Sequence, residues 1–202
     1  RGVAWLPQLE ALAWSAGLAG LVAAALVAWS WLTPGRSRLE PLWLALLILP
    51  GIVAGFGLLA PAGRLGLVAP AGSLLLWAFA SRFAFVAWLP LREPVESSQL
   101  EAAALAGLGP ARTWWRIVRP ASAPRALAAG LLVFVLCLGE LGPAVLLAPP
   151  GRQTLVQHVF TWMHYGYDEA VASACLLTAA VAAAGAWIVA YAGRKTVSRI
   201  AA

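Results

Sequence analysis

The sequence predicts an all-α membrane protein, a polytopic bundle of about five transmembrane helices interrupted by one polar segment. Hydrophobic residues make up 62% of the 202 residues and charged residues only 11%, whereas soluble chains are roughly half apolar and about a quarter charged. Apolar blocks of about 20 residues, the length that crosses a bilayer, recur along the chain. They do not alternate between apolar and polar residues as barrel strands do. We therefore expect a single membrane domain over residues 1–202.

Five blocks are long enough to be membrane-spanning helices. They are Leu9–Leu32, Pro41–Ala60, Leu67–Pro90, Ala126–Ala148 and Glu169–Tyr191. Glycine and proline interrupt three of them, at Pro50–Gly51, Pro70 and Gly142–Pro143, and neighbouring helices can satisfy the backbone groups that such residues free. Gly51 and Gly55 have the G-x-x-x-G spacing that lets helices approach closely. This pair favours packing inside the chain, with a subunit interface as the alternative.

Lysine and arginine predict the orientation of these helices, because cytoplasmic loops carry an excess of positive charge. If the polar stretch 92–125 is cytoplasmic, ten of the 14 positive charges lie on that side. Three lie on the other side (Arg1, Arg64 and Arg152), and Arg82 lies inside a block. We therefore expect the N-terminus outside, and residues 91–125 and the C-terminus in the cytoplasm. The net charge of +6 lies between apolar blocks rather than on a basic face, so nucleic acid is not an expected partner.

The polar stretch Arg92–Arg125 predicts two short helices joined by a glycine turn. Its segment QLEAAALA consists of strong helix formers, and Gly107 and Gly109 can end that helix by taking positive φ. Pro110 then begins a second helix, ARTWWRIV, which we expect to stop before Pro120. Such an elbow between two hydrophobic segments is suited to being held by another protein.

The segment TLVQHVFTWMH, before the last block, has apolar residues at helical spacing and predicts a short amphipathic helix at the outer surface. His158 and His164 lie six residues apart, whereas two ligands on one helix face lie three or four residues apart. An interfacial cluster of aromatic and polar side chains is therefore favoured over a metal site, and no bound metal is expected.

Two charged residues lie inside apolar blocks, where charge is costly and marks functional candidates. Glu140, in LCLGELGPA, either lines or gates a translocation path, or has a structural role beside the broken helix end at Gly142–Pro143. Arg82 lies nearer the cytoplasmic end, which its long side chain can reach. The rise of a helix places the two residues at depths that differ by about 10 Å, so a direct ion pair between them is not expected.

No arrangement of nucleophile and base indicates an enzyme. Lys195, the single lysine, is not part of a phosphate-binding loop, because Arg194 occupies the position directly before it, where that loop needs glycine. We therefore expect no cofactor on this chain, and any ATP it depends on is hydrolysed by a partner subunit.

The elbow resembles the signature of binding-protein-dependent ABC importer permeases of the type I class. That signature is E-A-A, three residues, Gly, nine residues, Ile, one residue and Leu-Pro. The matching residues are Glu101, Ala102, Ala103, Gly107, Ile117 and Pro120. Arg119 departs from the pattern, since it stands where leucine is usual. The resemblance covers nearly the whole chain, because the five-helix core of such permeases spans what is present.

The resemblance implies the type I ABC permease fold, a bacterial inner membrane and a role for the elbow. In that family the corresponding loop, here residues 93–120, docks as a coupling helix on a cytoplasmic ABC ATPase dimer and transmits its ATP-driven closure to the spans. Trp114 and Arg116 would then supply anchors of the types enriched at interfaces. The other implied partners are a second permease half or subunit and an extracytoplasmic solute-binding protein.

Within the family, GELGPAVLLAPPG and the T-L and HYG elements after it are similar to the second half of fused iron(III)-type permeases. Relatives of that group carry sulfate, thiamine, phosphonates and polyamines. The first residue is Arg1 rather than Met, so we expect a fragment or a C-terminal half. The alternative function is an ion-gradient-driven secondary transporter or channel fragment with Glu140 as the carrier. The elbow disfavours this alternative, because such a protein needs no dock for an ATPase.

Overall fold

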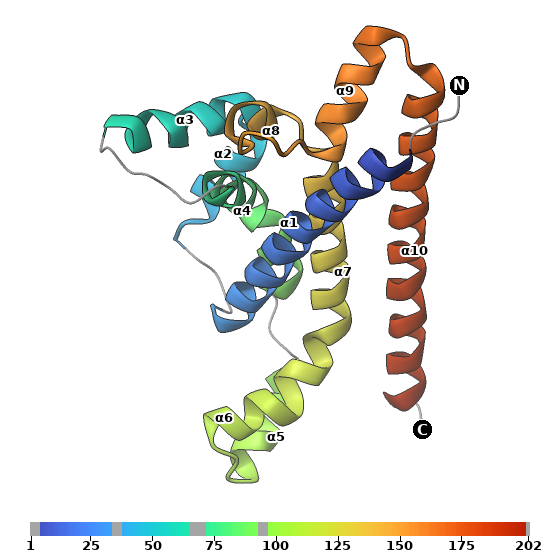
Figure 1. Cartoon of the computed structure of the whole chain (residues 1–202). Coiled ribbons are helices and arrows are strands. Elements are labelled where there is room, and N and C mark those ends of the chain that lie inside the picture. Colours follow the sequence, from blue (N-terminus) through green and yellow to red (C-terminus); the bar gives the residue numbers. More distant parts are fainter. Residues whose placement is uncertain (1–4, 34–37, 65–71, 93–96, 201–202) are drawn as a thin grey trace.

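The computed structural model describes residues 5–33, 38–64, 72–92 and 97–200, and within these ranges every regular element is a helix. The elements (Figure 1) are α1 (Trp5–Leu32), α2 (Glu40–Ile48), α3 (Gly51–Arg64), α4 (Ser73–Trp88), the 3-10 turn η1 (Leu89–Leu91), α5 (Ser97–Leu105), α6 (Pro110–Thr113), the π-helical turn η2 (Trp114–Val118), α7 (Arg119–Gly139), α8 (Gly142–Leu147), α9 (Leu155–Tyr165) and α10 (Asp168–Ile200). The all-α prediction is confirmed.

Four helical stretches are long and apolar enough to cross a membrane. They are Gln8–Leu32, Ser73–Leu91, Pro110–Gly139 and Asp168–Ile188. A fifth candidate is the pair of α2 and α3, which meet at an angle of 111° and together make one broken span. The described chain therefore has four or five helices that are compatible with a multi-pass membrane protein.

The second predicted block is not a straight helix. Leu49 follows α2 with ψ of 135°, and Pro50 has no N–H with which to continue the helix. α3 therefore begins at Gly51 in a new direction. The start of the third predicted block, with Leu67 and Pro70, lies outside the described residues.

The helix that was expected to stop before Pro120 continues through it. α6, η2 and α7 form one helical stretch from Pro110 to Gly139. Directly before Pro120, the N–H of Arg119 donates to the carbonyl of Trp114, five residues back, as in a π-helix. Because Pro120 falls within the first two residues after this turn, its missing N–H does not end the helix.

The centre of the bundle is formed by α1, α4 and α7. Close packing is possible where small residues face a neighbour, as at Gly130 of α7, where an added Cβ would lie 3.3 Å from Val27 of α1. Three tryptophans join α1, α2 and α4 by edge-to-face contacts. Trp43 lies between the other two, with ring centroids 4.7 Å from Trp29 and 5.4 Å from Trp88.

The bundle has two ends, and the shorter elements gather at one or the other (Figure 1). At one end, Nη1 of Arg92 donates to Oε1 of Glu40 at 3.2 Å, so the end of η1 lies beside the start of α2. The elbow of α5 and α6 projects from that end, and α10 runs towards it, while α3, α8 and α9 lie at the other end. Arg92 and the elbow thus share one end with the start of α2. The side of the membrane on which this end lies stays a prediction.

Candidate functional site

The first candidate site is the elbow, whose turn is a left-handed glycine cap. Gly107 has φ of +69°, its N–H donates to the carbonyl of Ala104, and the N–H of Leu108 donates to the carbonyl of Ala103. These two bonds define a Schellman motif, which satisfies the free carbonyls at a helix end while the chain turns sharply. The prediction for Gly107 is confirmed.

Gly109 has a different conformation. Its φ of −67° and ψ of 160° are extended angles that any residue adopts, and it is the N-cap of α6. The expectation that it takes positive φ is wrong, because one left-handed residue already ends α5, and α6 needs an extended residue before its first turn. Pro110 follows at the start of α6, as predicted.

Most signature residues lie on the surface of the elbow. The exposed ones are Glu101, Ala102, Gly107 and Pro120, and Arg116, the other expected anchor, is exposed as well. Ala103, in contrast, is only 3% exposed and packs inside the turn. Leu105 stands at the tip with 91% of its surface exposed. The elbow therefore offers small side chains and one apolar side chain with free space around them.

The base of the elbow rests on α1. The indole N–H of Trp31 donates to Oγ of Ser122 in α7 at 3.0 Å. Its ring lies edge-on to Trp114, with centroids 6.3 Å apart. Trp114 and Ile117 are half-buried. Trp31, for which the sequence predicted no role, therefore connects the base of the elbow to α1.

The structure gives a physical reason for the departure at Arg119. Its guanidinium lies 4.4 Å from the centroid of the Trp115 ring, within cation–π distance. Both residues are exposed, so the long side chain of Arg119 covers part of an aromatic face that water would otherwise contact.

The second candidate site is a junction where two helix breaks meet, between α2 and α3 and between α7 and α8. Nε of Arg82, from α4, donates to Oε2 of Glu140 at 3.1 Å. Its Nη1 donates to the carbonyl oxygen of Leu49. The expectation of no ion pair is wrong. It assumed a straight helix, whereas α7 ends at Gly139 and Glu140 has extended angles (φ −84°, ψ 103°) that turn it out of the helix.

These contacts satisfy groups that the breaks leave without partners. In a continuous helix the N–H of Val53 would bond to the carbonyl of Leu49, but here it bonds to Pro50 instead. Arg82 replaces that donor. The side chains of Arg82 and Glu140 are only 15% and 16% exposed, so removing one partner leaves the other charge largely shielded from water and destabilises the junction.

Glycines let the two breaks come into contact. A Cβ on Gly142 would lie 2.7 Å from the backbone nitrogen of Ile52, and one on Gly51 would overlap Oε1 of Glu140. Further along α3, a Cβ on Gly55 would lie 3.1 Å from Cδ1 of Leu146 in α8. The G-x-x-x-G pair therefore packs inside the chain, as predicted. The carboxylate of Glu140 lies at the start of α3, where the helix dipole favours negative charge.

The third candidate site is a polar pocket of about 750 Å³ between the start of α1 and the segment before α9. Its polar lining consists of Glu10, Trp14, Arg152, Gln153 and His158. The guanidinium of Arg152 lies 4.8 Å from the ring centroid of Trp14. Burial lowers the pKa of His158 below its usual 6.5, which favours the neutral imidazole.

The predicted amphipathic helix is α9, and a capping box starts it. The backbone N–H of Thr154 donates to Oε1 of Gln157 at 2.7 Å. His158 faces the polar pocket, whereas His164 is exposed and its Nδ1 lies 2.8 Å from the carbonyl oxygen of Phe160. Among the described residues, no three of His, Cys, Asp and Glu are grouped as a metal site would require.

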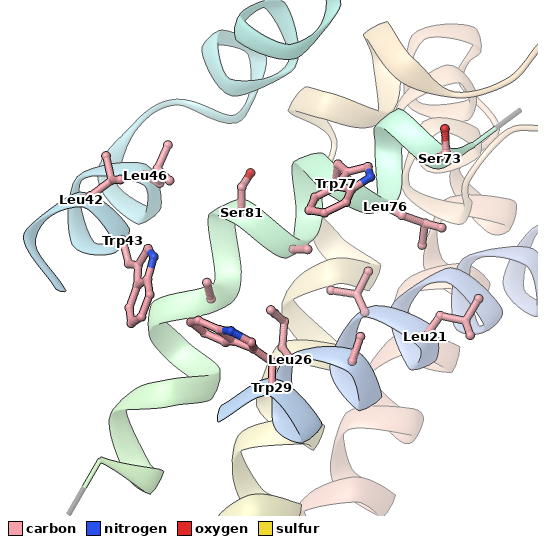
Figure 2. A pocket seen from close by; sticks show the side chains of 14 residues that line it. Leu21, Leu26, Trp29, Leu42, Trp43, Leu46, Ser73, Leu76, Trp77 and Ser81 are labelled. Atoms are coloured by element: carbon pink, nitrogen blue, oxygen red, sulfur yellow. The ribbon is translucent and has the colours of Figure 1, made fainter. Parts of the chain in front are cut away.

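An apolar crevice of about 740 Å³ lies between α1, α2 and α4 (Figure 2). In the figure, Trp29 and Leu26 of α1, Trp43 of α2 and Trp77 of α4 surround the space. No pattern in the sequence predicts this crevice, because its walls come from three helices that only the tertiary fold brings together.

Both charges of the junction were predicted to be important from the sequence, but their other partners were not. Leu49 contributes a backbone carbonyl, which no side-chain pattern reveals, although Pro50 after it signalled the break. Gly142 was noted only as an interruption, yet it is the point of backbone contact with α3.

A scan against protein-family models gives no match for this chain, and a search of curated proteins gives no match either. The family therefore stays a prediction that rests on the residues of the elbow.

Proposed function

We propose that this chain is the transmembrane subunit of an ATP-driven ABC importer, which forms a translocation path and couples to a separate ATPase. The observation that carries the proposal is the elbow. The E-A-A and glycine of the signature lie on a helix–glycine–helix turn that projects from one end of a bundle of apolar helices. The glycine has the positive φ for which that position needs glycine.

The elbow is directly connected to the junction of Arg82 and Glu140 by a continuous helix. Pro110–Gly139 is one helical stretch that starts in the elbow and ends beside Glu140. The end of this stretch that lies near the elbow contacts α1 through Trp31. A displacement of the elbow by a closing ATPase dimer would therefore be carried along α7 to the junction of Arg82 and Glu140.

The proposed partners follow from the same role. They are a cytoplasmic ABC ATPase dimer at the elbow, a second permease half or subunit, an extracytoplasmic solute-binding protein and the lipid bilayer. α10 packs mainly on α7 and α9 and presents apolar side chains outward, which suits lipid or a second permease half. The proposed solute is iron(III) or another small solute of the kinds carried in that family (sulfate, thiamine, phosphonate or polyamine).

The ion pair weighs against the alternative of a gradient-driven carrier. A carrier group has to be open to the transported ion from each side in turn, whereas the carboxylate of Glu140 is only 16% exposed and lies against the start of α3. Arg82 contacts Glu140 directly. A role of Glu140 in holding helices together is therefore favoured over a role as a carrier.

A pair of matched substitutions tests the coupling role. We expect Gly107→Thr to reduce both the ATPase subunit that co-purifies with the chain and the ATP-driven uptake of iron(III) by proteoliposomes. A β-branched residue with positive φ is strained, by about 1–2 kcal/mol or more. Gly109→Thr should leave both quantities unchanged, because the site has extended angles, open space around a Cβ and an N-cap role that threonine fills.

Two results would overturn the proposal. One is uptake that persists in proteoliposomes from which every ATPase has been removed. The other is equal ATPase co-purification and uptake for the two threonine variants, which would separate the elbow from coupling.

A further inference from the structure

We infer that Arg82 and Glu140 form a latch that keeps α3 against α8, and that a path through the chain opens only when this ion pair is released. The inference rests on the proposed function, since it assigns the closed state of the path to this junction. It goes further than the coupling role of the elbow, because it gives a function to the two charges at the far end of α7.

Arg82 contacts both helix breaks at once. Arg82 belongs to α4, yet it binds the residue that ends α2 and the residue that follows α7. One side chain therefore ties together the two breaks at which α3 and α8 change direction. Any separation of α3 from α8 changes the position of Leu49 or Glu140 relative to Arg82.

Glycines form the face of α3 that contacts α8. The backbone at Gly51 and Gly55 lies against the side chains of Pro143 and Leu146. Ile52, Val53 and Phe56 of α3 are about half exposed, whereas Leu58 packs against the core. A glycine face has no side chain of its own that must rearrange when it parts from its neighbour, and the ion pair is the polar tie at this contact that must be released.

Opening of the junction exposes both charges to new surroundings. A separated Arg82 and Glu140 would need water or a charged solute in place of each other. Both are partly exposed already, so the open state can hydrate them after a small displacement. The helical stretch from the elbow ends beside Glu140, so movement at the elbow reaches the latch directly.

The native Cys137 reports on the junction. It is 4% exposed, lies one helical turn before Glu140, and its carbonyl accepts the N–H of Glu140 at 3.4 Å. With the exposed Cys175 replaced by alanine, labelling of the full chain in membranes by N-ethylmaleimide measures how often the junction opens. We expect Glu140→Gln to label at least about tenfold faster than the parent.

A second ion pair of the described chain provides the control. Arg92→Gln removes the pair with Glu40 at the elbow end, which is also partly buried. It should leave the labelling rate of Cys137 unchanged. Faster labelling for Glu140→Gln alone supports the latch. Equal rates for the parent and a monodisperse Glu140→Gln protein overturn it, as does equal acceleration by Arg92→Gln.

A disulfide lock tests the latch without touching the charges, and so remains decisive if Glu140→Gln does not fold. A Cβ at Gly55 would lie 3.7 Å from Cβ of Leu146, within the range of disulfides. In Gly55→Cys with Leu146→Cys, oxidation should slow the labelling of Cys137, because α3 can no longer leave α8. An unchanged rate in the cross-linked protein would show that Cys137 becomes accessible without this separation and would overturn the inference.

The outcome of these measurements does not depend on whether the proposed function is correct. Thiol labelling requires neither ATPase nor solute, so it tests the latch alone. A chain that does not co-purify with an ATPase would contradict the proposed function while the labelling result stands.

Discussion

At the scale of single residues, Gly139 and Gly142 show that the same residue type has different structural roles at nearby positions. A Cβ on Gly142 would lie 2.7 Å from the backbone nitrogen of Ile52, whereas a Cβ on Gly139 would meet nothing within 4 Å. Gly139 ends α7 and Gly142 begins α8, so only three positions separate them. The difference arises because the chain turns at Glu140 and carries Gly142 against the start of α3.

We expect Gly142→Ala to destabilise the protein by about 1–3 kcal/mol, the usual cost of forcing an extra carbon into a packed site. Gly139→Ala should stay within about 1 kcal/mol of the parent, since alanine is the better helix former and has room. Thermal unfolding in detergent compares the two. Equal melting temperatures for both variants would show that α3 and α8 are not in backbone contact.

The charges illustrate what sequence reasoning can and cannot reach at this scale. Arg82 and Glu140 stood out because charge inside apolar blocks is costly. Their pairing was missed because depth was inferred from a straight helix, while the break at Glu140 displaces the carboxylate. The third partner, the carbonyl of Leu49, belongs to the backbone and leaves no mark in the sequence.

At the scale of elements, local signals predicted starts and turns better than ends. Gly107 and the amphipathic pattern of Leu155–Tyr165 were recognised because both depend on neighbouring residues alone. Pro120 was misread, since proline after a π-helical turn does not end a helix in which neighbours satisfy the backbone. The bend between α2 and α3 was noted as an interruption, but its angle of 111° depends on packing against α4 and α8.

α9 should make the protein less stable in acid. Burial lowers the pKa of His158 in the fold, so between that pKa and the unfolded value near 6.5 the unfolded chain binds more protons. The contribution of His158 is complete above about pH 6.5 and is lost as the pH falls through the folded pKa. Glu10 and Arg152 share the pocket with the imidazole.

Melting temperatures of detergent-solubilised protein between pH 8 and pH 5 check this expectation. The parent should lose more stability on acidification than His158→Gln. His164→Gln, at an exposed position on the same helix, should behave like the parent. A parent and a His158→Gln variant with parallel pH profiles would exclude the effect.

At the scale of the whole molecule, one ion pair constrains how often the chain crosses the bundle. Arg92 and Glu40 hold the end of η1 beside the start of α2. The residues between them must therefore leave this end and return to it. α4 is the returning crossing, so the outgoing one lies before α4, where α2 and α3 are the candidate broken span. This parity favours five crossings over four and agrees with the five blocks read from the sequence.

Five crossings would place the elbow and α9 on opposite sides of the membrane, and the charge pattern predicts that the elbow lies inside. Leu105 at the tip of the elbow is 91% exposed and Met163 on α9 is 63% exposed, so both are suitable for labelling. With Cys137 and Cys175 replaced by alanine, Leu105→Cys should react with a membrane-impermeant maleimide in inverted vesicles and not in intact cells. Met163→Cys should show the reverse, because α7 crosses once between them. Labelling of both cysteines from one side would mean that Pro110–Gly139 does not span the bilayer, and reversed sides would mean that the arginine-rich end faces outward.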